Sequence, residues 1–354
     1  MNKYWGARVL SILAGIVFAV AASEASVRAL HLAPPVVKNI GPLRFVENRK
    51  LFYEFIPGSM VDGSRINSRG FKDTGFEIKK GNNEVRIAMI GDSITQGFGV
   101  RLGETFSDQL EILLNRKARE AGIDAAYNVM NFGVCGYNLE AEVELLKIKA
   151  LEYKPDIVIL NFFHNDNDPI PGLQLFFADG SAMTDRQKNE IFIKYAVGTG
   201  SSVRAINREL LFRSKLYAFI VTRFHALFYS KKSMQSAVRQ YHKSIVGEDD
   251  PVFFEHLAAM LDLSRQHEFR LLICIHPHLL WGEHPNNFLF ESVAGQYGIT
   301  YFRMMTYYEA AGIPPHAIQL NKEDRCHPNA MGHKIAADAL FLELKHNNYI
   351  DRRL

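Results

Sequence analysis

The stretch RIAMIGDSITQG, residues 86–97, decides the fold, because an apolar run of strand length ends abruptly in Gly91-Asp92-Ser93. A helix is expected over residues 104–121, after a short turn. This pattern predicts a β-strand that delivers a serine to its carboxyl end, which is the edge where open α/β sheets place their chemistry. Ser93 is a nucleophile only when a neighbouring group takes its proton.

The far end of the chain offers that group in residues 324–329, which read DRCHPN. His327 is the candidate general base, and Asp324 is the candidate carboxylate that orients its ring. A spacing of three lets both side chains come from one turn of a loop or short helix. The alternative for Ser93 is an N-cap serine, and the presence of the Asp324 and His327 pair makes this alternative less favoured. The alternative for His327 is a surface histidine in a helix-start turn.

Four short blocks follow one another along the chain: residues 91–93 (GDS), 131–137 (NFGVCGY), 164–166 (HND) and 324–328 (DRCHP). Together they resemble the blocks of the SGNH (GDSL-type) hydrolase family of esterases and acyl-transferring enzymes, over roughly residues 62–345. Block three of that family usually reads Gly-x-Asn-Asp, whereas Phe163 stands in place of the glycine here. The Gly-x-Ser-x-Gly elbow of α/β-hydrolases is absent.

Attack on an ester carbonyl creates an oxyanion, which needs hydrogen-bond donors aimed at it. Three candidates are the backbone N–H of Ser93, the backbone N–H of Gly136 and the side-chain amide of Asn165. The resemblance maps the family's block-two glycine to Gly136 by its spacing from Asn131, with Gly133 as the fallback. The alternatives are ordinary turn glycines and, for Asn165, an Asx turn.

Other polar residues near the blocks have less specific expectations. Asp92 and Asp166 are expected to bind loop backbone rather than to perform acid–base work. The histidines of residues 276–284 match no standard zinc spacing, so no metal is expected. The glycines of residues 97–103 lack both the spacing and the lysine of a nucleotide-binding loop, so no cofactor is expected.

Strand-length apolar runs alternate with helical segments over residues 85–345. The unbroken apolar run at residues 157–160 is typical of a strand covered on both faces. Such alternation predicts right-handed crossovers and a parallel sheet, and therefore a three-layer α/β/α sandwich. The resemblance implies the flavodoxin-like order of five strands. The expected strands are Val85–Ile90, Tyr127–Phe132, Asp156–Phe162, Arg270–His276 and Ile299–Arg303, and the expected helices are Glu104–Ala121, Leu139–Leu151, Val252–His267, Asn286–Tyr297 and Ala330–Lys345.

Residues 1–31 are interpreted as a signal anchor or a signal peptide. Fifteen uncharged residues, 9–23, follow Lys3 and Arg8, and as a helix they measure about 22 Å, short of the roughly 30 Å hydrocarbon core. Residues 19–21 (AVA) fit a signal-peptidase site. A snorkelling Arg8 extends the run enough to span, and similar family members often keep such an anchor. Both membrane interpretations place the domain outside the cytoplasm; the alternative is a helix packed on the domain.

The length and the amino-acid composition fit a globular protein with one main domain and an insertion. Of 354 residues, 47% are apolar and 22% charged, so a large core forms without disulfides. The three cysteines give no disulfide framework, and free thiols are expected. Residues 32–84 are rich in turn signals and are predicted to be a linker and an irregular lead-in. Within them, residues 66–71 resemble a segment that commonly precedes block one in anchored members, without indicating its role.

Residues 169–250 interrupt the alternation with helical, basic and aromatic sequence. Between residues 201 and 243 the net charge is +8, whereas the whole chain carries +3. One hypothesis is an interfacial helix that lies on anionic lipid near the active site. The other is a helical cap packed on the sheet domain with solvated charges. Nucleic-acid binding fits poorly with an extracytoplasmic location. The basic residues are Arg204, Arg208, Arg213, Lys215, Arg223, Lys231, Lys232, Arg239 and Lys243, against the acidic Glu209.

The function predicted from these observations is that of an SGNH-type serine esterase. It acts outside the cytoplasm, is associated with a membrane through residues 1–31, and cleaves an acyl ester of a small molecule, saccharide or lipid. Its hydrolase domain covers residues 85–345. Two alternatives stay open: an O-acyltransferase that uses the same triad, and a membrane-tethered glycan- or lipid-binding module in which the triad is idle.

Overall fold

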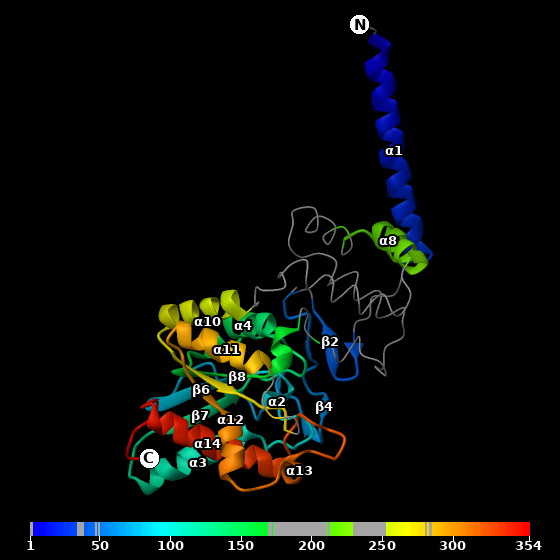
Figure 1. The fold of residues 1–354 in the computed structure, drawn as a ribbon. Helices are drawn as coiled ribbons and strands as arrows, with labels where there is room; N and C mark the ends of the chain where they lie inside the picture. Colours follow the sequence, from blue (N-terminus) through cyan, green and yellow to red (C-terminus); the bar gives the residue numbers. More distant parts are fainter. Residues whose placement is uncertain are drawn as a thin grey trace. The chain divides into compact units, whose positions relative to one another are not determined.

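The computed structural model describes residues 3–33, 39–46, 48, 50–168, 172, 210, 213–228, 253–279, 282 and 285–354 (Figure 1). The chain divides into two compact units. One contains Met1–Lys38 and Phe176–Asp249, and the other contains Asn39–Leu175 and Asp250–Leu354. Most of the predicted insertion at residues 169–250 therefore lies outside the described residues, and the two hypotheses about it stay predictions.

The second unit is built on a parallel sheet of five strands. Their order is β10-β9-β8-β6-β7, which is the flavodoxin-like order predicted above. The strand order reverses at β6, because β7 lies on one side of β6 and β8 lies on the other. The carboxyl end of β6 is therefore at a topological switch point, where α/β sheets bind ligands. The strands are β6 (Glu84–Gly91), β7 (Ala126–Asn131), β8 (Ile157–Phe162), β9 (Arg270–Ile275) and β10 (Thr300–Arg303).

Helices cover both faces of the sheet (Figure 1). One layer holds α3 (Phe106–Glu120), α12 (Met304–Ala310) and α14 (Ala330–His346). The other holds α4 (Leu139–Ile148), α10 (Phe253–His267) and α11 (Pro285–Gln296). The three-layer α/β/α prediction is confirmed. The short helices α12 and α13 (Pro315–Ile318) were not predicted, because four to seven residues are too few to show helical periodicity.

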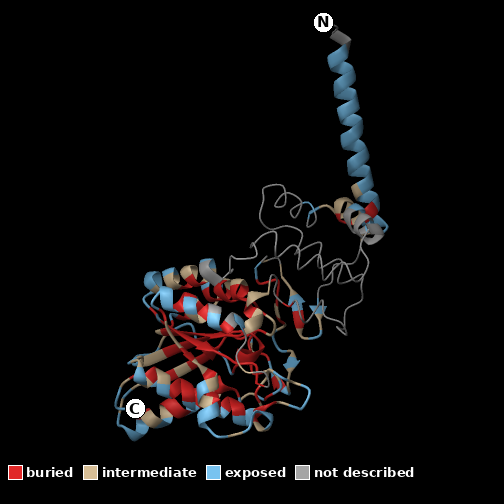
Figure 2. Ribbon diagram, viewed as in Figure 1, coloured by how far each residue is buried: buried red, intermediate tan, exposed pale blue. Residues whose placement is uncertain are grey.

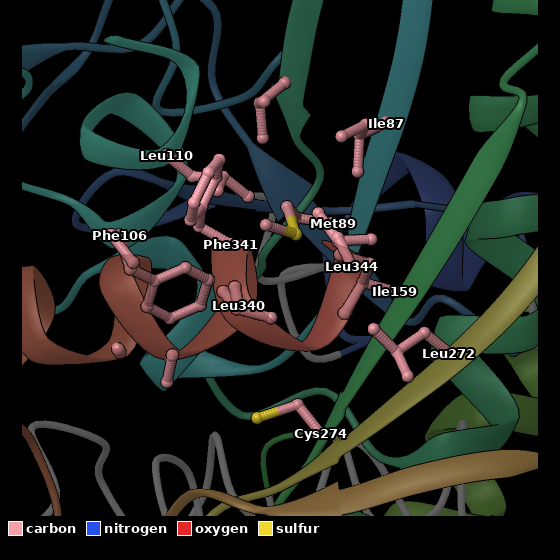
Figure 3. Packing of buried hydrophobic residues seen from close by; sticks show 14 of the residues in the cluster. Ile87, Met89, Phe106, Leu110, Ile159, Leu272, Cys274, Leu340, Phe341 and Leu344 are labelled. Atoms are coloured by element: carbon pink, nitrogen blue, oxygen red, sulfur yellow. The ribbon is translucent and has the colours of Figure 1, made fainter. Parts of the chain in front are cut away.

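The core lies on the two faces of the sheet. Every residue of β8 is buried, and Figure 2 shows the strands as the most continuously buried part of the chain. Side chains from β6, β8 and β9 pack against α3 and α14 (Figure 3). Burial of each such side chain contributes about 1.5–3 kcal/mol. The packed residues include Ile87, Met89, Leu110, Ile159, Leu272, Leu340, Phe341 and Leu344.

The lead-in is more ordered than the sequence predicts. It contains an antiparallel sheet of β1 (Asn39–Ile40), β2 (Leu43–Phe45) and β3 (Tyr53–Phe55), followed by a hairpin of β4 (Met60–Val61) and β5 (Ser64–Arg65). The Tyr53 hydroxyl donates to the Cys135 carbonyl at 2.6 Å, which fastens the lead-in to the second block. Strands of two or three residues are too short to show alternation, so the pattern missed them.

The helix α1 (Lys3–Ala29) has 27 residues and belongs to the first unit. Its segment Trp5–Ala29 is long and apolar enough to cross a membrane, with a mean hydropathy of 1.9. Its large apolar side chains from Trp5 to Val20 are exposed. The helix continues past the uncharged run, and there Glu24 and Arg28 form an ion pair of 2.6 Å across one turn. The Glu24 carboxylate also accepts the backbone N–H groups of Lys215 and Leu216, at 2.9 and 2.8 Å, and so caps α8 (Lys215–Phe228).

Candidate active site

Ser93 stands at the carboxyl end of β6, as predicted, and is the first residue of the short helix α2 (Ser93–Gln96). The Asp92 carboxylate caps this helix by accepting the Ile94 N–H at 2.9 Å. A Cβ at Gly91 would lie 2.0 Å from the Thr95 hydroxyl oxygen, so glycine lets the end of β6 pack closely against α2. The serine is 7% exposed and is held at the switch point of the sheet.

The three residues predicted to form the triad lie together. The Ser93 Oγ is 2.8 Å from Nε2 of His327, and Nδ1 of the same ring is 2.8 Å from Oδ2 of Asp324. The other carboxylate oxygen of Asp324 accepts the backbone N–H groups of Cys326 and His327, at 3.0 and 2.9 Å. One oxygen therefore shapes the loop, and the other orients the imidazole.

The surroundings of the Asp324 carboxyl favour its ionised form. Burial acts to raise its pKa, but hydrogen bonds from the His327 ring and from the backbone N–H groups of His327 and Cys326 outweigh burial and lower the pKa to about 2. A carboxylate beside the second ring nitrogen stabilises an imidazolium without taking its proton.

The residues after His327 fix its position. Asn329 caps α14 by accepting the N–H groups of Met331 and Gly332, at 3.0 and 3.1 Å. Its amide nitrogen donates to the carbonyls of Ala317 and Gln319. The helix-start turn considered as an alternative for this segment is therefore present, and it is what holds the histidine.

The glycine candidates differ in what their N–H groups bind. The Gly133 N–H donates to the Asn131 side chain at 2.9 Å, and a Cβ there would lie 2.1 Å from the Gln96 backbone nitrogen. Gly136 has a left-handed φ of +75°, and its N–H has no acceptor among the described residues. The Ser93 N–H, at the start of α2, likewise has no partner within the helix. These contacts favour Gly136 over the fallback.

Asn165 lies in the 3-10 turn η2 (His164–Asn167), directly after β8. Its side chain is a hydrogen-bond partner of the Asp92 carboxyl. Its Oδ1 is buried and has no partner among the described residues. Phe163, which replaces the family's glycine, has an extended backbone with φ −129° and ψ 156°. No left-handed residue is required there, so the departure from the family pattern leaves the turn intact.

The family model described as GDSL-like Lipase/Acylhydrolase family matches residues 89–335. The chain belongs to this family. It is accordingly a hydrolase of ester bonds. The matched region begins inside β6 and ends inside α14, and so contains Ser93, Gly136, Asn165, Asp324 and His327.

Two of the solved structures similar to the chain are described as esterases. A two-domain esterase (CEX) active on acetylated mannans is 15% identical with a TM-score of 0.41, covering 76% of this chain and 50% of that chain. The chain thus spans half the length of that relative. Axe2, an acetylxylan esterase from Geobacillus stearothermophilus, is 14% identical with a TM-score of 0.41, covering 73% of this chain and 94% of its own. No match was found among curated proteins.

In this esterase, buried carboxyl groups surround the serine and Asn165. Asp92 and Asp166 bind loop backbone as predicted, Asp166 by accepting the Phe163 N–H at 2.8 Å. Glu142 of α4 was missed by sequence reasoning; it is 1% exposed, and neither carboxylate oxygen has a partner among the described residues. Burial raises the pKa of Glu142 and of Asp166 well above usual values, and the nearby Asp92 adds to both shifts. The available signal was an acid on the apolar side of a predicted helix.

Two histidines outside the triad are buried and stack against Phe106. The ring of His276 stacks on it at 5.9 Å and that of His333 at 5.4 Å. Nδ1 of His333 accepts the Phe106 N–H at 3.1 Å, so it carries no proton. Burial lowers the pKa of both histidines to about 3. They are structural groups that fit only in the neutral form.

These histidines predict a loss of stability in acid. Their folded pKa lies below the unfolded value of about 6.5, so their contribution is complete above pH 6.5 and is lost as pH falls toward 3. Each lowers the free energy of unfolding by up to about 1.4 kcal/mol per pH unit in that window. Urea unfolding from pH 7 to 4.5 measures the loss, which should be smaller in His333→Gln. Equal slopes in both proteins would contradict the assignment. The wild type must be compared with His333→Gln, because the raised pKa values of Glu142 and Asp166 increase the free energy of unfolding as pH falls.

Proposed function

We propose that this member of the family is a serine esterase whose nucleophile is Ser93, whose general base is His327 and whose orienting carboxylate is Asp324. The observation that carries the proposal is the unbroken chain of two 2.8 Å contacts from the serine oxygen to the aspartate oxygen. These distances are within the range for proton transfer to a general base. An idle triad in a binding module has no need of such alignment.

Catalysis begins when Nε2 of His327 takes the Ser93 proton and Oγ attacks the acyl carbon. A carbon–oxygen bond forms, and the carbonyl oxygen becomes an oxyanion. The donors proposed for it are the N–H groups of Ser93 and Gly136 and the side-chain amide of Asn165. Such preorganised donors typically supply the largest single part of the rate enhancement.

The imidazolium then gives its proton to the leaving alcohol, and the ester bond breaks. The acyl group remains on Ser93 as an ester. Water attacks this acyl-enzyme while His327 takes a proton from it, and collapse of the second intermediate releases the carboxylic acid and returns the proton to the serine. Asp324 stays ionised throughout, which its low pKa supports.

The substrate class we propose is an acyl ester of a saccharide or lipid. We expect the enzyme to release acid from a panel of acetylated glycans and acyl esters at rates that added hydroxyl acceptors leave unchanged. Mass spectrometry of the products, with titration of the acid, measures both outcomes. Acylated acceptor in excess of free acid would instead identify an O-acyltransferase. Absence of turnover and of fluorophosphonate labelling would leave a binding module.

We propose further that α1 anchors the esterase in the cytoplasmic membrane with its catalytic domain outside. Lys3 and Arg8 precede the apolar segment, and basic residues stay on the cytoplasmic side. An alkaline phosphatase fused to the C-terminus should therefore be active, and the protein should sediment with membranes. A fused reporter that works only in the cytoplasm would contradict this location.

A further inference from the structure

The segment of residues 66–71, to which the sequence assigns no role, forms a tight turn. The Asn67 side chain accepts the N–H groups of Arg69 and Phe71, at 2.9 and 3.0 Å. Gly70 has a left-handed φ of +87°, and a Cβ there would lie 3.2 Å from the Phe55 carbonyl. The turn delivers the next two residues, Lys72 and Asp73, into the interior, where they are 1% and 7% exposed.

The Lys72 ammonium has three oxygen partners for its three N–H donors. It donates to the Asp62 carboxylate at 3.0 Å, to the Gly97 carbonyl at 2.7 Å and, by a shorter contact, to the Val100 carbonyl. Burial lowers the pKa of Lys72, and the hydrogen bond and charge of Asp62 act in the opposite direction. All three N–H donors of the side chain are thus bound, one by a carboxylate and two by carbonyls of one loop.

That loop, residues 97–100, directly follows the helix of the nucleophile and contacts the general base. Gly97 is the C-cap of α2, with φ +77°. Phe98 follows it, and its ring lies 4.5 Å from the ring of His327, centroid to centroid. On the other side, a Cβ at Gly99 would lie 2.1 Å from Leu320, whose N–H donates to the His327 carbonyl at 2.9 Å. The loop is therefore held between Lys72 and the segment that carries the base.

The neighbouring Asp73 holds the second block in the same way. Its carboxylate accepts the Asn131 N–H at 3.0 Å. The Asn131 side chain in turn donates to the Thr95 carbonyl at 2.8 Å and accepts the Gly133 N–H. Two adjacent buried polar side chains, those of Lys72 and Asp73, thus support two different loops of the site.

We infer that Lys72 is a positioning residue of the esterase: its buried ammonium fixes the loop of residues 97–100 and thereby presses Phe98 against His327. The inference rests on the proposed role of His327 as general base. A buried cation costs desolvation energy, and an apolar side chain of similar volume often serves stability as well or better. The benefit that offsets this cost is geometric, because two carbonyls at an irregular helix end are fixed by strong, charge-assisted hydrogen bonds.

The first test is Lys72→Met, which keeps the length of the side chain and removes the ammonium. We expect kcat for an activated ester to fall about 10²-fold, as displacements of about 1 Å in an active site do, while KM changes less than about threefold. The matched control is Arg86→Met. Arg86 is also 1% exposed and also donates to backbone carbonyls, those of Tyr153 and Lys79, but lies near the opposite end of β6. It should lose thermal stability and keep its kcat per folded molecule.

The second test is a double-mutant cycle with Phe98→Ala, a half-buried loop residue whose removal leaves the core intact. If Lys72 acts through Phe98, Phe98→Ala alone lowers kcat about tenfold, and the double variant is no worse than Lys72→Met. A double variant that loses the product of the two factors would overturn the inference, as would an unchanged kcat in Phe98→Ala or equal losses in Lys72→Met and Arg86→Met. Failure of the proposed function is recognised separately, by wild-type turnover that does not depend on Ser93.

Discussion

Replacing Ser93 with alanine is expected to lower kcat for an activated ester by about 10⁴- to 10⁶-fold, the range found for serine nucleophiles of established triads. The change removes the oxygen that attacks the acyl carbon and leaves His327 without its 2.8 Å partner. It does not remove the turn, because Asp92 rather than the serine side chain caps α2. Initial rates and fluorophosphonate labelling of the purified protein measure the effect.

A matched control for this variant is Ser107→Ala. Ser107 is a fully buried serine of α3, and its hydroxyl has no partner among the described residues, so its loss should leave both kcat and labelling unchanged. His327→Ala should cost about as much as Ser93→Ala, and Asp324→Ala somewhat less. The double variant Ser93→Ala with His327→Ala should be no worse than either single change, because triad members act as a unit. Normal turnover by a well-folded Ser93→Ala protein would refute the proposed mechanism.

The sheet and the triad were predictable because their signals are local or periodic. An apolar run such as residues 157–160 marks a strand covered on both faces, and every residue of β8 is buried. Parallel strands bring their carboxyl ends to one edge, so Ser93 and Asn165 were expected together from chain order alone. The spacing of Asp324 and His327 within one turn made their contact predictable as well.

The supports of the site were not predictable, because they depend on contacts between segments that no periodicity relates. Lys72 lies in a stretch that is predicted to be irregular, and its proposed role depends on hydrogen bonds to two carbonyls about 25 residues later in the chain. Glu142 reads as one acid on a helix, and only the fold shows that it is buried beside Asp166. The sequence left Gly133 and Gly136 both open, and the choice between them follows from an N–H already bound to Asn131.

Replacing Asn165 with alanine is expected to lower kcat by about 10²- to 10³-fold with little change in KM, the loss typical of one missing oxyanion donor. The amide belongs to η2, which follows β8 in the chain, and β8 pairs with β6, the strand that carries the nucleophile. A donor placed there strengthens its bond only when charge develops on the carbonyl oxygen, so the loss falls on the transition state rather than on substrate binding. Steady-state kinetics with one ester over a range of concentrations separate the two parameters.

Two further variants decide whether Asn165 acts as a donor or only as a spacer. Asn167→Ala alters a neighbour in the same turn and should leave kcat within about threefold of wild type, because no oxyanion donor is lost. Asn165→Asp keeps the size of the side chain, removes its N–H donors and adds an acid where the oxyanion forms. Because like charges in a buried site repel strongly, its kcat should be no higher than that of Asn165→Ala. A donor-free aspartate that restores activity relative to alanine, or a defect confined to KM in Asn165→Ala, would show that Asn165 contacts the substrate without stabilising its transition state.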